Sequence, residues 1–152
     1  MRLGDEVVFE AASDLDGRLV ILDINANGEV TVIFPNQLVA ATDIGRIATG
    51  GTVAVPGPDD PGFTACQAVE PTGKGQLLAL VVPEDFDIER HAAGSSLLSK
   101  GFAPVDNPPS YIIRLIRQIE QALLNAAEAG RSAEQELARW GYAVTGYEIT
   151  RQ

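Results

Sequence analysis

Short apolar runs separated by turn residues fill the first half of the chain, and this pattern predicts a series of β-strands. Residues 5–13 place alternate apolar side chains on one face. Residues 18–24 and 76–82 carry apolar side chains on both faces, which is typical of central strands covered from both sides. Further strands are predicted over residues 30–34, 52–55 and 63–70. Because short turns separate the strands, we expect antiparallel pairing.

The segment DINANGE, which starts at Asp23, resembles the first half of an EF-hand calcium loop. Such a loop needs a bidentate acid at its twelfth position, which is Phe34 here, and it needs a helix on each side. Asn27-Gly28 is instead typical of a two-residue hairpin turn, because both residues tolerate a positive φ. We therefore predict a β-hairpin, in which Asp23 and Asn25 bond to the turn backbone.

The second half predicts a crossover and then a long helix. Residues 83–110 mix acids, small residues and prolines, so they are expected to form a crossover with one short helix over 88–98. Asn107 can cap a long helix over residues 108–130, and Gly130 suits its left-handed end. Apolar residues recur along this helix at helical spacing, namely Ile112, Leu115, Ile116, Ile119, Leu123 and Ala126.

A second helix and a last strand complete the chain. Ser132 and Gln135 have the spacing of a capping box, which predicts a short helix over residues 132–140. Residues 142–150 are the predicted last strand, with a bulge at Gly146.

Together these elements predict one α+β domain over residues 1–152. We expect a mostly antiparallel β-sandwich, Ig-like or similar, with the long helix packed on it and a C-terminal strand. The helix is apolar over more than half of its girth. It is therefore either buried within the monomer or joins copies of the chain into a homo-oligomer through residues 111–129.

The charge of the chain excludes some partners. There are 11 basic and 21 acidic side chains, a net charge of −10, so nucleic acid and anionic membrane surfaces are not expected partners. No apolar run approaches the roughly 20 residues of a membrane span. The first residues lack the pattern of a signal peptide. We expect a soluble protein, either cytoplasmic or exported as part of a longer precursor.

Two residues could form a cysteine-peptidase dyad, because Cys66 and His91 are the single cysteine and the single histidine of the chain. Cys66 lies among small residues on an alternating strand, where a buried, inert cysteine is the usual case. His91 lies in a polar segment and follows the cysteine, whereas the caspase histidine precedes it. We therefore expect no catalytic residues, and one cysteine with one histidine is too few for a usual zinc site.

Acidic residues in the turns are the remaining candidates for chemistry. Asp14, Asp16, Asp85 and Asp87 could hold a calcium ion if their loops met at one end of the sheets, although solvated turn acids are the usual case. Residues 72–75 (TGKG) predict a hairpin turn rather than a phosphate loop, because strands flank them on both sides. No cofactor is expected.

Several motifs in a fixed order resemble one bacterial family. They are DG.L.ILDI from Asp16, NGEVTVIFPN from Asn27, ATGGTVAVP from Ala48, EPTGKGQLLALV from Glu70 and W…YEIT from Trp140. This order is similar to a bacterial domain of unknown function that is commonly found C-terminal to caspase-like (metacaspase-type) peptidase domains. The motif residues that the resemblance marks as structural are Asn27, Gly28, Phe34, Pro35, Asn36, Pro71 and Gly73.

The resemblance implies a β-rich accessory domain without established chemistry. Any peptidase activity would belong to a separate domain of the precursor. We therefore expect a non-catalytic accessory or protein-interaction domain, whose partner is another protein or an adjacent caspase-like peptidase domain. The alternative is a β-sandwich module that binds a small ligand or a carbohydrate.

Overall fold

The computed structural model describes residues 1–35, 45–57, 65–86, 106–127 and 130–151. Two helices and nine strands lie in this part of the chain. The strands are β1 (Glu6–Val7), β2 (Phe9–Ser13), β3 (Gly17–Ile24), β4 (Val30–Phe34), β5 (Arg46–Ile47), β6 (Gly51–Val55), β7 (Cys66–Gln67), β8 (Gly73–Val82) and β9 (Gly141–Ile149). The helices are α2 (Pro108–Ala126) and α3 (Ala133–Leu137). Neither is long and apolar enough to cross a membrane.

The strands form one large sheet and two small ones. The large sheet has the order β4-β3-β8-β9, and β5 pairs with the start of β3. The small sheets pair β1 with β7 and β2 with β6. All these strand pairs are antiparallel, as predicted. The sandwich, Ig-like or similar, stays a prediction, because the hydrogen bonding divides the strands among three sheets.

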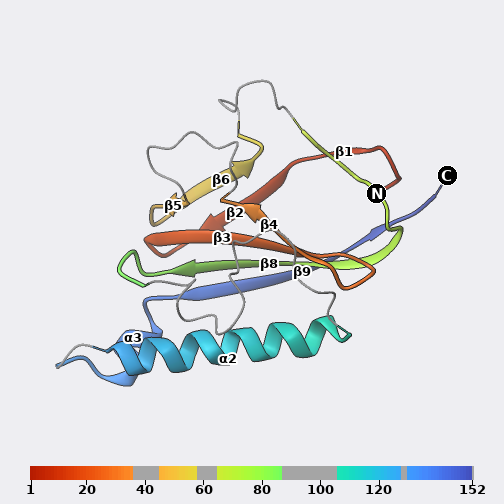
Figure 1. Ribbon diagram of the computed structural model, residues 1–152. Coiled ribbons are helices and arrows are strands. Elements are labelled where there is room, and N and C mark those ends of the chain that lie inside the picture. Colours follow the sequence, from red (N-terminus) through yellow and green to blue (C-terminus); the bar gives the residue numbers. More distant parts are fainter. Residues whose placement is uncertain (36–44, 58–64, 87–105, 128–129, 152) are drawn as a thin grey trace.

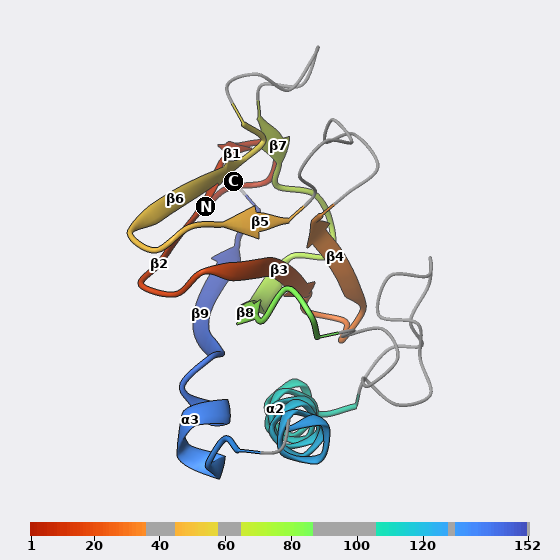
Figure 2. The same ribbon diagram turned by 90° about the vertical axis from the view of Figure 1, so that its left-hand side faces the viewer.

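Both faces of the large sheet are covered, which explains the apolar pattern of its central strands. On one face, Leu22 and Leu78 pack against α2, and on the other, Leu19 and Ile21 pack toward β2 and β6. Figures 1 and 2 show α2 below the large sheet and the β2–β6 pair on its opposite side. The prediction that residues 18–24 and 76–82 form central strands is confirmed.

Helix α2 begins as predicted but ends earlier. The Asn107 side chain accepts a hydrogen bond of 3.0 Å from the Ser110 N–H and caps the helix. The prediction that Gly130 ends the helix is wrong, because Ala127 already leaves the helical region with a ψ of 126°. One side of the helix is buried against the sheet, through Ile112, Leu115, Ile119, Ala122 and Leu123.

The opposite side of α2 faces solvent, where Ile113 is 51% exposed and Ala126 is exposed. The apolar stripe is thus mainly core within one chain. A homo-oligomer through residues 111–129 stays a prediction.

The β3–β4 hairpin is confirmed, but its turn is not the predicted two-residue turn. Residues 25–29 form a longer loop, in which the Asn25 N–H donates to the Glu29 carbonyl at 3.0 Å. Gly28 alone among these residues has a positive φ, of +78°. The Asn25 side chain stabilises the loop by accepting hydrogen bonds from the N–H groups of Asn27 and Glu29. Asp23 does not bond to the turn and instead contacts Tyr147.

Two predictions about the β8–β9 pair are wrong. Residues 72–75 are not a hairpin turn, because β8 begins at Gly73 and pairs from there with β9. Gly146 is not a bulge, since the register runs without a shift from Gly73↔Ile149 to Val81↔Gly141. The apolar residues on either side of Gly146 lie on opposite faces of β9. Ile149 is buried on one face, whereas Tyr142 and Val144 on the other face are exposed, so no slip is needed to bring the two sets to one face.

The strands over residues 30–34 and 52–55 are confirmed as β4 and β6, whereas three other predicted elements are divided or shorter. Residues 5–13 divide at the exposed Val8 into β1 and β2, which belong to different sheets. Within residues 63–70, the described strand is only Cys66–Gln67. The crossover helix over 88–98 lies outside the described residues. Helix α3 has the predicted capping box but ends at Leu137.

Candidate functional site

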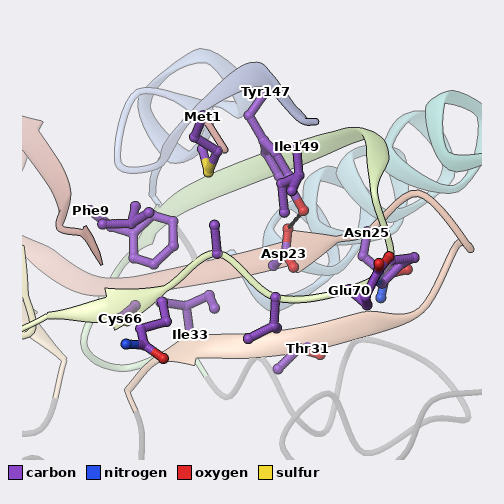
Figure 3. Close-up of a pocket in the computed structure, with 15 residues that line it drawn as sticks. Met1, Phe9, Asp23, Asn25, Thr31, Ile33, Cys66, Glu70, Tyr147 and Ile149 are labelled. Atoms are coloured by element: carbon purple, nitrogen blue, oxygen red, sulfur yellow. Dashed lines mark hydrogen bonds between the residues drawn. The ribbon is translucent and has the colours of Figure 1, made fainter. Parts of the chain in front are cut away.

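A cavity of about 250 Å³ lies between the large sheet and the chain segment that contains β7. Its floor is formed by β3, β4 and β9, and the opposite wall is formed by residues 66–71 (Figure 3). We call it the β7 pocket. Its lining residues are Met1, Val7, Phe9, Asp23, Asn25, Thr31, Ile33, Cys66, Gln67, Ala68, Val69, Glu70, Pro71, Tyr147 and Ile149.

A hydrogen bond across the central strand organises the floor of this pocket. Tyr147 of β9 pairs with Gly75 of β8, and the tyrosine hydroxyl donates to Asp23 Oδ1 of β3 at 2.7 Å. The ring therefore lies over Gly75. A Cβ atom added to Gly75 would come within 2.7 Å of the ring atom Cε1, and nearer still to Cζ and the hydroxyl oxygen. Only glycine at this position leaves room for the Tyr147–Asp23 hydrogen bond.

Burial raises the pKa values of both partners of this hydrogen bond. Desolvation raises the pKa of Asp23, although the Tyr147 hydroxyl acts in the opposite direction. Desolvation, together with the hydrogen bond to Asp23, raises the pKa of Tyr147. The lining residues in the described part of the chain include no lysine, arginine or histidine. The half-buried Asp23 therefore has a hydroxyl partner but no ion-pair partner among the described residues.

Cys66 also lines the β7 pocket. Its thiol is half-buried, and desolvation raises its pKa, which disfavours the nucleophilic thiolate at neutral pH. His91, the other member of the candidate dyad, lies outside the described residues. The structural role of Cys66 stays a prediction that its raised pKa supports.

The candidate calcium ligands lie at the other end of the large sheet. Asp16 precedes β3 and Asp85 follows β8, at the end where Arg18 pairs with Val82. Asp16 accepts from the Thr49 N–H at 2.8 Å, and this bond lowers the pKa of Asp16.

Asp85 accepts from Arg139 at 2.7 Å, and Asp14 is exposed in the turn before β3. No group of three or more potential ligands comes together in the described parts of the chain. Asp87 lies outside them. A calcium site here stays a prediction.

The described motif residues lie at strand ends and turns, and Pro71 among them lines the β7 pocket. Phe34 is buried at the end of β4 and is followed by a cis peptide bond to Pro35. Pro71 also follows a cis peptide bond and lines the pocket. Gly73 has a φ of +126°, which a residue with a side chain rarely adopts. The hairpin glycine Gly28 is buried, Asn27 is exposed, and Asn36 lies outside the described residues.

The Tyr147–Asp23 pair and a buried carboxylate in α3 were not predicted from the sequence. Asp23 alternates with the buried Leu19 and Ile21 along β3 and so lies on the same strand face. This position could have indicated that the Asp23 side chain is partly buried and needs a partner. Glu136 is 2% exposed and accepts from Arg131 at 2.8 Å and Arg139 at 3.0 Å. Arg139 also bonds Asp85, so this cluster ties α3 to the segment that follows β8.

The outer edge of β9 is a second candidate surface. This strand is the last in the order of the large sheet, with β8 on its inner side (Figure 2). Its end is tied to the N-terminal residues, where the Thr150 N–H donates to the Met1 carbonyl at 3.1 Å. Over residues 141–147 the outer edge has no pairing strand in the described structure. Residues 141–147 carry no charge, and Tyr142 and Val144 are 52% and 43% exposed.

Comparisons with known proteins assign a family to the chain. The family model described as "Domain of unknown function (DUF4384)" matches residues 1–85, which is more than half of the 152-residue chain. The match ends just after β8, so α2, α3 and β9 lie outside it. No curated protein matches, and no solved structure matches. The chain therefore belongs to the DUF4384 family of domains of unknown function.

Proposed function

We propose that this chain is a non-catalytic accessory domain that binds an extended segment of another protein along the outer edge of β9. The observation that carries the proposal is the length of this edge. Strand β9 pairs with β8 over nine residues, while its outer edge is unpaired over residues 141–147 within the described structure. An open edge offers backbone N–H and C=O groups with which an incoming strand can form a ladder.

The composition of the edge favours such a partner. Proteins usually protect an exposed edge with charged residues, proline or a bulge. Residues 141–147 have none of these, although the chain carries a net charge of −10. Two copies of the chain would also repel each other through this charge, so a different protein is the better occupant.

A caspase-like peptidase is the partner that we propose, either as a neighbouring domain of a longer precursor or as a separate chain. The order of motifs from Asp16 to Thr150 supports it, because the family that they resemble commonly follows such peptidase domains. The raised pKa of Cys66 supports a role for this domain that is not itself catalytic.

Binding measurements on two matched variants test the proposal. Val144→Lys places a charge on the edge strand, and Val8→Lys places the same charge at another exposed valine, which is 48% exposed between β1 and β2. Titration calorimetry with the peptidase domain of the same precursor or operon should show binding that Val144→Lys weakens about ten-fold or more, whereas Val8→Lys leaves it within about two-fold.

Equal losses in the two variants would show that charge alone, and not the edge of β9, governs the interaction. Unaltered binding by Val144→Lys would place the contact elsewhere on the domain. A concentration-dependent dimer in sedimentation, abolished by Val144→Lys, would assign the edge to a second copy of the chain. Each of these three results contradicts the proposal.

A further inference from the structure

The geometry points to a binding site for a small organic cation in the β7 pocket: a free amine whose ammonium group binds the Asp23 carboxylate and whose short apolar chain lies between the two walls. This site does not depend on the proposed role of the β9 edge. The inference rests on one half-buried carboxylate, the apolar walls around it and the charges of the lining.

The Asp23 carboxylate is the polar centre of the pocket. Tyr147 donates to its Oδ1 atom, and no ion pair engages it among the described residues. An ionised carboxylate can accept about four hydrogen bonds, so Oδ2 is available to a ligand donor. Figure 3 shows the side chains of Asp23 and Tyr147 directed toward each other among the lining residues. The tyrosine thereby holds the carboxylate in one orientation.

The charges around Asp23 favour a cation. Glu70, the other acidic residue in the described lining, is already paired with Arg151 at 3.0 Å. The Met1 amino group donates to the Glu148 carbonyl at 2.9 Å rather than to Asp23. A half-buried carboxylate without a counter-charge is unfavourable, and an ammonium group from outside would remove that penalty. An anionic ligand would meet two carboxylates instead.

The walls define the rest of the ligand. Val7, Phe9, Ile33 and Ile149 are apolar lining residues, and Phe9 and Ile33 belong to the edge of the cluster that packs β2 and β6 on the large sheet. The cavity of about 250 Å³ is smaller than the roughly 300–1,000 Å³ that is typical for drug-sized ligands. A short unbranched alkyl chain therefore suits it.

A series of ligands with the same carbon chain tests the charge requirement on the native chain. Calorimetric titration at neutral pH compares n-hexylamine, n-hexanol and hexanoate. Hexylammonium should bind saturably, hexanol about ten-fold or more weakly, and hexanoate more weakly still, because only the ammonium adds an opposite charge to the hydrogen bond that it donates to the carboxylate. Equal binding of hexylamine and hexanol, or no saturable binding of hexylamine up to about 10 mM, would overturn the inference.

Two isosteric variants then test the assigned residue. Asp23→Asn removes the charge but keeps an oxygen that can accept from Tyr147, and it should weaken hexylamine binding about ten-fold or more. Glu70→Gln removes another carboxylate of the same lining, but this carboxylate is already paired with Arg151. The change should therefore alter the affinity for hexylamine less than about two-fold. An unchanged affinity in Asp23→Asn, or an equal loss in both variants, would overturn the assignment.

The same ammonium chemistry could come from a lysine side chain of a peptide. Nα-acetyl-lysine N-methylamide has the same charged group on a shorter chain with two peptide bonds attached. It should bind more weakly than hexylamine, because its amides would meet the apolar walls. Tighter binding of the lysine analogue would overturn the free amine as the ligand.

Discussion

The close approach of the Tyr147 ring to Gly75 makes a sharp prediction about stability. In Gly75→Ala, the new Cβ would overlap the ring, since it would lie 2.7 Å from Cε1 and closer to Cζ. Gly75 lies in a buried position of β8, between β3 and β9, so the backbone has little room to move away. The ring must therefore leave its place and give up the hydrogen bond to Asp23.

Three terms set the magnitude of the loss. Overpacking in a well-packed site typically costs about 1–3 kcal/mol. A hydrogen bond to a charged group contributes about 1.5–3 kcal/mol, and we take the low end because Asp23 and Tyr147 are half-buried. Replacing glycine by alanine also restricts the unfolded chain, which raises the free energy of unfolding by about 0.5 kcal/mol. We expect Gly75→Ala to lower the free energy of unfolding by about 2–4 kcal/mol.

Urea unfolding followed by circular dichroism measures this change, and two further variants show its origin. Gly146→Ala is the matched control, because its Cβ would meet only the Gly75 carbonyl oxygen at 3.9 Å, and it should change stability by less than about 1 kcal/mol. In a Tyr147→Ala background the ring is absent, so the added Gly75→Ala change should cost less than about 0.5 kcal/mol.

A loss of stability in Gly75→Ala no larger than that in Gly146→Ala would contradict a clash with the Tyr147 ring. An equal loss from Gly75→Ala with and without the ring would contradict it too, because the loss would then come from the backbone.

Three further predictions concern the cap of α2, the Glu136 carboxylate and the Tyr147 hydroxyl. Asn107→Ala removes the cap of α2 and should lower the free energy of unfolding, measured in urea, by about 1 kcal/mol. No measurable change would show that the hydrogen bond from the Ser110 N–H to Asn107 does not stabilise the helix. Burial alone would raise the pKa of Glu136, but hydrogen bonds from Arg131 and Arg139 outweigh it, and the net shift is downward. The stabilisation from Glu136 is therefore present above its ordinary pKa of 4.5 and is lost as the pH falls through the lower folded value. The melting temperature should fall more steeply on acidification in the native chain than in Glu136→Gln. Parallel curves of melting temperature against pH would contradict this prediction. The raised pKa of Tyr147 has the opposite consequence at alkaline pH, since the folded chain keeps a proton that the unfolded chain loses above the ordinary value of 10.0. Stability should fall as the pH rises above this value, and less so in Tyr147→Phe; an equal fall in both would show that other groups cause it.

Local features of the fold could be predicted from the sequence because their causes are local. Asn107 and Ser132 cap their helices with their own side chains, and residues 18–24 show by their two apolar faces that they form a central strand. The choice of strand partners depends on contacts between distant segments. Residues 5–13 looked like one strand, yet β1 and β2 join different sheets.

The candidate site depends even more on distant segments. Tyr147 and Asp23 are separated by 124 positions, and Gly75 lies between them in space. The glycine at residue 75 suggested a turn, because glycine is frequent in turns and the ring that requires its small size belongs to a strand much later in the chain. The predicted bulge at Gly146 failed for a similar reason: the register is set by the whole β8–β9 ladder.

Residue-resolved amide hydrogen exchange tests the central claim, that the outer edge of β9 is an open docking edge. In the free chain, the amides of residues 141–147 that point away from β8 should exchange rapidly, while those bonded to β8 are protected. Addition of the peptidase domain should slow these outer amides selectively. Outer amides that are already protected in the free chain, or protection that appears only on other elements, would contradict the account.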